Sequence, residues 1–237
     1  MSFLRDKDYA YQIESDFLGQ ITPTLEDRQQ AEAAAIREAS NYLRHRYDVA
    51  KIFIDVTAYA IDRVIKKDQV LELKAAAYDI AINYAVDKLV SYQADVYKKK
   101  TTAAAGTTPA QGTDWDKIGK QEGIYTALAD QTAGSYPSDD TKFTYGDPRD
   151  PQILMYAVDM TLYHLHSSVT PRQIPVVRAI RYDGNSPDQK GGAIGWLKRA
   201  GRPDGISPDL PLLTNPDNPD QGKSIRFGSE CKQDNDF

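Results

Sequence analysis

The chain has 237 residues, of which 41% are hydrophobic and 27% are charged, and its formal net charge is −5. This composition is that of a globular protein, and the acidic balance argues against a nucleic-acid binder that works by neutralising phosphates. The single cysteine, Cys231, leaves no internal disulfide, and no apolar run suits a signal peptide or a membrane helix, so we expect a soluble protein made inside the cell.

Two helices are predicted near the N-terminus. Apolar residues four apart indicate a short helix over 4–18. The pair Thr22–Pro23 has the residue types of an N-cap and a first helical position. The helix that follows is rich in alanine and runs to about Tyr47. The residues 51–59 are β-branched and roughly alternating, which indicates an extended or irregular segment.

A third helix is predicted over residues 69–93. Its apolar residues recur at helical spacing and cover more than one side, which is typical of a helix at the centre of a bundle. The residues that mark the stripes are Val70, Leu73, Ala77, Ile80, Ile82, Tyr84, Val86 and Leu89.

The pattern changes over residues 95–149, where a lysine run and a Thr/Ala/Gly segment replace the helical periodicity. We interpret this region as an insertion between two core helices. Within it, Ile124–Leu128 and Lys142–Tyr145 are predicted to pair as short strands. Loops of this length are commonly functional or ordered by a partner.

Helical structure is predicted again from Asp150–Pro151, an N-cap followed by proline at the first helical position. Pro175 begins a short helix, and Ser186–Pro187 caps the last one, which ends near Ala200 before Gly201. From Arg202 onward the chain is rich in Pro, Asp, Asn and Gly and buries too little apolar surface to fold alone.

The fold expected from these elements is mainly α. It is a small bundle of about five helices with a long insertion that contains β-structure and an extended C-terminal tail. The predicted parts are 1–94 and 150–205 for the two halves of the bundle, 95–149 for the insertion and 206–237 for the tail.

Candidate chemistry is sparse. His164 and His166 would lie on different sides of a helix, which does not suit metal chelation. Closely spaced carboxylates could bind a divalent ion or serve as acid and base, but they lack the spacing of an EF-hand loop. These carboxylates are Asp139, Asp140, Asp147 and Asp150. We therefore predict no catalytic residue, no cofactor site and no metal site.

The residues that suit a protein–protein interface are stronger candidates for a functional role than these carboxylates and histidines. Arg178 and Arg181 lie three apart beside Tyr182, and arginine and tyrosine are frequent at binding hot spots. The alternative is that they are surface residues whose stems pack along the bundle. The candidate residues for a subunit or portal interface are Arg178, Arg181, Tyr182, Trp196, Ile225, Phe227 and Phe237.

Three segments carry a resemblance to a known family. They are NYLRHRY at Asn41–Tyr47, LKAAAYDIAINYAV at Leu73–Val86, and the stretch Ile180–Gly205. The last contains the positions Arg181, Tyr182, Ala193, Trp196, Leu197 and Gly201. In this order the segments resemble the head–tail connector, or adaptor and head-completion, proteins of tailed bacteriophages.

The resemblance implies a structural virion protein and not an enzyme. It would form a ring of twelve copies beneath the portal, extend the DNA channel and provide the docking surface for the tail. The implied partners are further copies of the chain, the portal protein and tail or neck proteins, while DNA passes without sequence-specific binding. The implied place is the neck of the virion, after synthesis in the host cytoplasm, and the implied role of residues 209–237 is to reach a neighbouring subunit or the portal.

Three other functions stay open at this point. The chain could be another neck or tail-completion protein, which would bind the tail tube. It could be a helical binding module of cellular origin. It could also be a metal-dependent hydrolase that uses the aspartates of the insertion.

Overall fold

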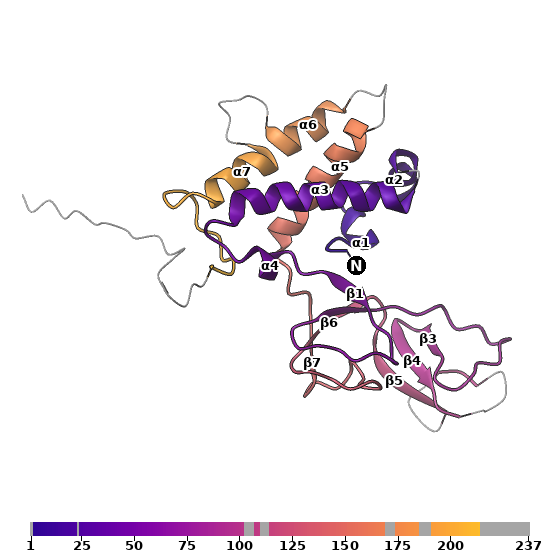
Figure 1. Ribbon diagram of the computed structural model, residues 1–237. Helices are drawn as coiled ribbons and strands as arrows, with labels where there is room; N and C mark the ends of the chain where they lie inside the picture. Colours follow the sequence, from indigo (N-terminus) through magenta and orange to yellow (C-terminus); the bar gives the residue numbers. More distant parts are fainter. Residues whose placement is uncertain are drawn as a thin grey trace, which may run out of the picture. The chain divides into compact units, whose positions relative to one another are not determined.

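The computed structural model describes residues 2–22, 24–101, 107–109, 114–168, 174–184 and 191–213 (Figure 1). The chain divides into two compact units, each built from two separate stretches of sequence. The first unit comprises Met1–Asp6 and Ile54–Arg149, and the second comprises Lys7–Phe53 and Asp150–Phe237. The first contains the strands and the second contains the helix bundle.

The fold is mixed α/β and not mainly α. Helices account for 36% and strands for 19% of the structure, and the strands form two sheets. The expectation of a helical bundle with an insertion is therefore wrong for the chain as a whole. The reason lies in residues 54–94, which belong to the β unit and not to the bundle.

The β unit contains a four-stranded and a three-stranded sheet. The first sheet has the order β1-β2-β6-β7, with β1 parallel to β2 and the other neighbours antiparallel. The second sheet is the antiparallel series β3-β4-β5. The strands are β1 (Val56–Ala58), β2 (Val70–Leu73), β3 (Leu89–Tyr92), β4 (Asp95–Lys99), β5 (Trp115–Lys120), β6 (Gly123–Ala127) and β7 (Phe143–Tyr145).

The predicted central helix over 69–93 does not exist. Its ends are the strands β2 and β3, and Asp68 and Asp87 have positive φ angles of 62° and 67°, which no α-helix contains. Val70 and Leu73 are fully buried in the sheet, whereas Ile80 is 63% exposed. The alanine-rich stretch favours a helix locally, but pairing of β2 with β6 overrides that preference.

The predicted pairing of Ile124–Leu128 with Lys142–Tyr145 is confirmed. These segments form β6 and β7, and Tyr125 faces Tyr145 in the antiparallel register. Both strands contribute to the main core of the unit, in which Phe143 and Ala127 pack beside Leu73 of β2. The supposed insertion is thus an integral part of a folded unit.

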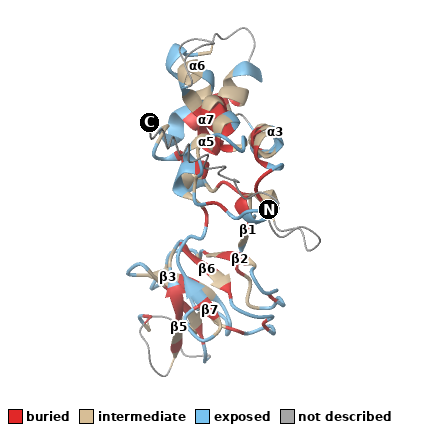
Figure 2. Ribbon diagram, turned by 90° about the vertical axis from the view of Figure 1, so that its left-hand side faces the viewer, coloured by how far each residue is buried: buried red, intermediate tan, exposed pale blue. Residues whose placement is uncertain are grey.

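Among the described residues, the helical unit consists of three short helices and four longer ones. Its core lies where α3 and α7 pack around α5, and Figure 2 shows buried residues gathered on α5 and α7. The helices are α1 (Asp6–Tyr9, whose first residue belongs to the other unit), α2 (Ser15–Ile21), α3 (Leu25–Leu43), α4 (Val49–Ile52), α5 (Pro151–Ser168), α6 (Val176–Asp183) and α7 (Gly192–Ala200).

Several helix boundaries differ from the prediction. A single helix over 4–18 is wrong, because a turn separates α1 from α2. The N-cap of α3 is Thr24 and not Thr22, since the Thr24 hydroxyl accepts a hydrogen bond from the backbone N–H of Asp27 at 3.1 Å. Residues 51–59 hold the end of α4 and the strand β1, which agrees with an irregular segment.

The predicted start of α5 and the predicted end of α7 are confirmed. A carboxylate oxygen of Asp150 accepts hydrogen bonds from the N–H groups of Gln152 and Ile153, so Asp150 is the N-cap of α5. Helix α7 ends at Ala200, before Gly201. The predicted cap at Ser186–Pro187 lies outside the described residues. Within the described part of the chain, no helix is long and apolar enough to cross a membrane.

Candidate functional site

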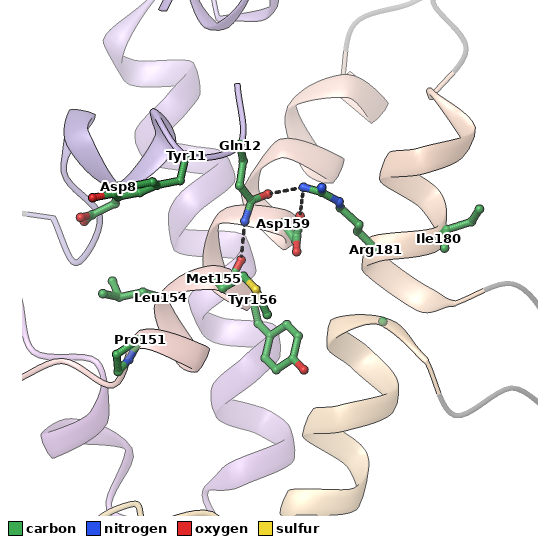
Figure 3. Close-up of a pocket in the computed structure, with 11 residues that line it drawn as sticks. Asp8, Tyr11, Gln12, Pro151, Leu154, Met155, Tyr156, Asp159, Ile180 and Arg181 are labelled. Carbon is green, nitrogen blue, oxygen red and sulfur yellow. Dashed lines mark hydrogen bonds and ion pairs between the residues drawn. The ribbon is translucent and has the colours of Figure 1, made fainter. Parts of the chain in front are cut away.

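The two arginines of α6 both bind the turn that follows α1. Arg178 donates a hydrogen bond to the backbone oxygen of Gln12 at 2.7 Å, and Arg181 donates to its side-chain oxygen at 3.2 Å. The side-chain amide of Gln12 in turn donates to the backbone oxygen of Met155 on α5 at 3.1 Å (Figure 3). Gln12 therefore links three segments that are distant in the sequence.

A buried carboxylate lies beside these arginines. Asp159 of α5 is only 5% exposed, and one of its oxygens lies 3.6 Å from Arg181 and 3.8 Å from Arg178. Burial raises the pKa of Asp159, and the two arginines offset this effect only in part. The same oxygen accepts no hydrogen bond among the described residues.

Tyr182 connects α6 to two other helices. Its hydroxyl donates to the Glu38 carboxylate of α3 at 2.8 Å, and its ring stacks on Tyr163 of α5 with centroids 3.8 Å apart. Burial is the main effect that raises the pKa of Tyr182, and the hydrogen bond to Glu38 raises it further. His164 also contacts Glu38 at 3.2 Å. In the single chain, this predicted interface residue joins α3, α5 and α6.

Trp196 lies inside the helical unit. It is 8% exposed, and its ring packs against Tyr156 of α5 with centroids 5.1 Å apart. Arg178 is half-buried, and Arg181 has the more exposed side chain of the two arginines. The structure thus brings Arg178, Arg181, Tyr182 and Trp196 around α5. The candidate residues Ile225, Phe227 and Phe237 lie outside the described residues.

The structural role of Arg46, just after the end of α3, was not predicted from the sequence. The buried guanidinium of Arg46 donates to the backbone oxygens of Ala200, Arg202 and Ile206 at 2.9–3.2 Å and to the hydroxyl of Ser207 at 2.8 Å. The only sequence signal is the group Arg44-His45-Arg46. Composition alone does not reveal which of these side chains points inward.

A cavity of about 700 Å³ opens among α5, α6 and the turn after α1 (Figure 3). Apolar side chains form much of its wall, and the Asp159–Arg181 pair marks its polar end. Its lining residues are Asp8, Tyr11, Gln12, Pro151, Leu154, Met155, Tyr156, Asp159, Ile180, Arg181 and Gly192. This concavity was not foreseen from the sequence.

Three of the four aspartates weighed for metal chemistry, namely Asp139, Asp147 and Asp150, have local structural partners. Asp139 accepts hydrogen bonds from Thr141, and Asp150 caps α5. Asp147 accepts hydrogen bonds from Arg149 at 2.7 and 2.9 Å, on its two oxygens. Among the described residues, no group of three or more His, Cys, Asp or Glu side chains is arranged to hold a metal ion.

Neither protein-family models, nor curated proteins, nor solved structures gave a match to this chain. The features that the structure adds are the contacts around α6, the buried Arg46 and the cavity beside Asp159.

Proposed function

We propose that this protein is a structural connector between the head and the tail of a tailed bacteriophage. In this proposal it forms a ring beneath the portal, extends the DNA channel and offers the tail a docking surface. The proposal concerns assembly and not catalysis.

One observation carries the proposal. The first and third of the segments that resemble connector proteins pack directly on each other in the helical unit. Arg46, in the first segment, binds the backbone oxygens of Ala200 and Arg202, in the third. The second segment, Leu73–Val86, does not support the proposal. It resembles a core helix of the family, but in this structure it forms the end of a strand and a loop.

Exposed apolar residues on both units support an assembling protein. Val176 and Val177 at the start of α6 are 73% and 61% exposed. In the β unit, Ile80 and Ile82 lie exposed on the loop between β2 and β3. A closed ring needs two different faces on each subunit, and exposed apolar groups are common where such faces become buried.

The acidic charge suits a channel through which DNA moves. A net charge of −5 repels a polyanion at long range, so a ring of such chains would not hold the DNA tightly. This is the electrostatic behaviour that passage of DNA requires.

The direct test is the native mass of the full chain, alone and mixed with the portal protein of its source phage. We expect a complex with one copy of the chain for each portal subunit. A chain that stays monomeric and ignores the portal contradicts the proposal. Binding to the tail tube instead of the portal would favour the alternative of a tail-completion protein.

A pair of variants assigns the contact to α6. Replacing Val176 and Val177 by aspartate should abolish the complex, because it places charge in an apolar contact. The control is Leu25→Asp, which adds a single carboxylate at an exposed apolar residue in the first turn of α3, where a carboxylate is favourable. Loss of the complex in the control as well would show that added charge alone, and not α6, is responsible.

A further inference from the structure

The cavity beside α5 is a hollow with apolar walls that the described residues leave open. It measures about 700 Å³, within the range of sites that take up small molecules, so it has room for several aliphatic side chains. Leu154, Met155 and Tyr156 form part of its wall, and Tyr11 at its border is 85% exposed (Figure 3). A protein segment that carries apolar side chains gains free energy by filling such a hollow.

A second apolar surface lies on the β unit, in the loop between β2 and β3, residues 74–88. Ile80, Ile82 and Val86 are 63%, 48% and 41% exposed. Three exposed aliphatic residues within seven positions form a concentrated patch, which is typical of an interaction surface. The other exposed large apolar residues described in this unit lie far from one another in the sequence, namely Val64, Leu128 and Tyr145.

The aromatic side chains of this loop hold it in place, and the aliphatic ones do not. The ring centroids of Tyr78 and Tyr84 each lie 6.0 Å from that of the buried Trp115 of β5. The Tyr84 hydroxyl accepts a hydrogen bond from the backbone N–H of Asp79 at 2.8 Å. The isoleucines are therefore presented on a loop that is already ordered, and such a loop loses little conformational entropy on binding.

The polar end of the cavity suits a carboxylate of this loop. Arg181, whose side chain is 46% exposed, contacts Gln12 and Asp159 through Nη1. A guanidinium has five N–H donors, so Arg181 can bind a further carboxylate. The loop supplies one, because the exposed Asp79 directly precedes Ile80.

The remaining charges of the two surfaces do not oppose the contact. Asp8 also lines the cavity, while Lys74 and Lys88 are exposed at the two ends of the loop. Each surface therefore carries both signs of charge, and neither repels the other as a whole.

We propose that the β2–β3 loop of one copy docks in the cavity of a second copy. Ile80 and Ile82 enter the hollow, and Asp79 pairs with Arg181 at its polar end. The two surfaces belong to different parts of the chain, so the contact is head-to-tail, and a repeated head-to-tail contact builds a ring when its rotation closes. The inference deepens the connector proposal and rests on it for the closure of the ring.

The first test is self-association of the full chain without portal protein, measured by sedimentation velocity over a range of concentrations. We expect assemblies larger than a dimer, because each copy in a dimer still has either a free loop or a free cavity. A chain that stays monomeric at the highest concentration overturns the proposal.

Two variants remove one surface each. Ile80→Asp/Ile82→Asp places charge in the loop contact, and Met155→Lys fills the cavity with a charged side chain. All three residues are at least 45% exposed, so the changes leave the cores intact. We expect self-association of each variant alone to be weakened roughly 30-fold or more, as for a central contact of an interface.

An equimolar mixture of the two variants should form a 1:1 dimer and nothing larger. The intact cavity of the loop variant accepts the intact loop of the cavity variant, and the two altered surfaces block further growth. Formation of this dimer also shows that both variants are folded. A mixture that stays monomeric, or a variant that dimerises by itself, contradicts a head-to-tail contact between these surfaces.

Controls separate the loop from added charge and the cavity from misfolding. Val64→Asp/Leu128→Asp adds the same two carboxylates at exposed aliphatic residues of the β unit and should associate like the unchanged chain. Equal weakening by this control contradicts the role of the loop. Tyr11→Ser is a second cavity variant at an almost fully exposed residue, and unchanged association of this variant together with Met155→Lys overturns the role of the cavity.

Binding to the portal protein is measured separately, so the two proposals can fail independently. A chain that binds the portal while the mixture gives no dimer contradicts only the loop contact. Dimer formation in the mixture by a chain that ignores the portal contradicts only the connector function.

Discussion

Gly201, just after α7, lies directly against the backbone carbonyl of Tyr42 on α3. A Cβ atom at Gly201 would overlap that oxygen, although the φ angle of −73° is ordinary for any residue. The glycine is therefore required by the close approach of two chain segments and not by its conformational freedom.

Gly201→Ala should lower the free energy of unfolding of the helical unit by about 1–3 kcal/mol, because an added methyl group must displace the backbone. Gly19→Ala is the control, since a Cβ there meets no atom within 4 Å and alanine favours the helix α2. Urea unfolding of both variants checks this. Equal stability of Gly201→Ala and the unchanged protein would contradict the close contact.

Arg46→Met should destabilise the helical unit by about 2–5 kcal/mol, because several buried oxygens lose a charged donor. The matched variant Arg44→Met changes an exposed arginine of the same turn and should stay within about 0.5 kcal/mol. Thermal unfolding followed by circular dichroism measures both. A similar loss in the two variants would contradict the specific role of Arg46.

The β unit should lose stability in acid through Asp147. Burial alone would raise the pKa of this carboxyl, but the hydrogen bonds and charges of Arg149 and Arg5 outweigh burial and hold the pKa below its usual 3.8. A lowered folded-state pKa means that the stabilisation is present above the unfolded-state value and is lost as the pH falls from about 4 through the folded-state pKa.

Asp147→Asn should remove this part of the pH dependence and lower stability at pH 7. Unfolding between pH 3 and 7, followed by Trp115 fluorescence in a Trp196→Phe background, reports on the β unit alone. Asp130→Asn is the control, because this carboxyl is exposed: its main hydrogen bond comes from the backbone N–H of Lys67, its ion pair with Lys66 is exposed as well, and we expect a smaller effect of pH. The prediction fails if both variants show the same slope of stability against pH.

Ala94→Gly should stabilise the β unit. Gln93 and Ala94 form the two-residue turn between β3 and β4, with φ angles of 49° and 65°. Both angles are positive, as in a type I′ turn, and such a conformation costs a residue with a Cβ about 1–2 kcal/mol. A rise in the urea midpoint checks this, while Ala81→Gly, at a residue without positive φ, should give no rise.

The contacts of Tyr182 predict different effects for two substitutions. Tyr182→Phe keeps the stacking on Tyr163 and loses only the hydrogen bond to Glu38, so we expect a loss of about 1 kcal/mol. Tyr182→Ala also loses the stacking and should cost about 2–3 kcal/mol, less than a fully buried aromatic residue, because the ring is only partly buried. Chemical unfolding of the two variants separates these contributions, and equal losses would contradict the observed stacking.

The amino-acid sequence determined those features that depend on neighbouring residues. Asp150–Pro151 begins a helix because a carboxylate can bond to N–H groups two and three residues ahead. The segments 124–128 and 142–145 were predicted to pair as short strands, and they do pair. The end of α7 before Gly201 was also predicted, although this glycine is required by its contact with Tyr42 and not by a local C-cap conformation.

Only the tertiary structure decided the features that depend on distant partners. Val70–Leu73 is a strand because Gly123–Thr126 pairs with it, and this partner is not visible in a local window of apolar residues. The alanines that follow favour a helix on their own, which led to the wrong fold class. The buried states of Arg46 and Asp159 arise in the same way, since both depend on packing between segments far apart in the chain.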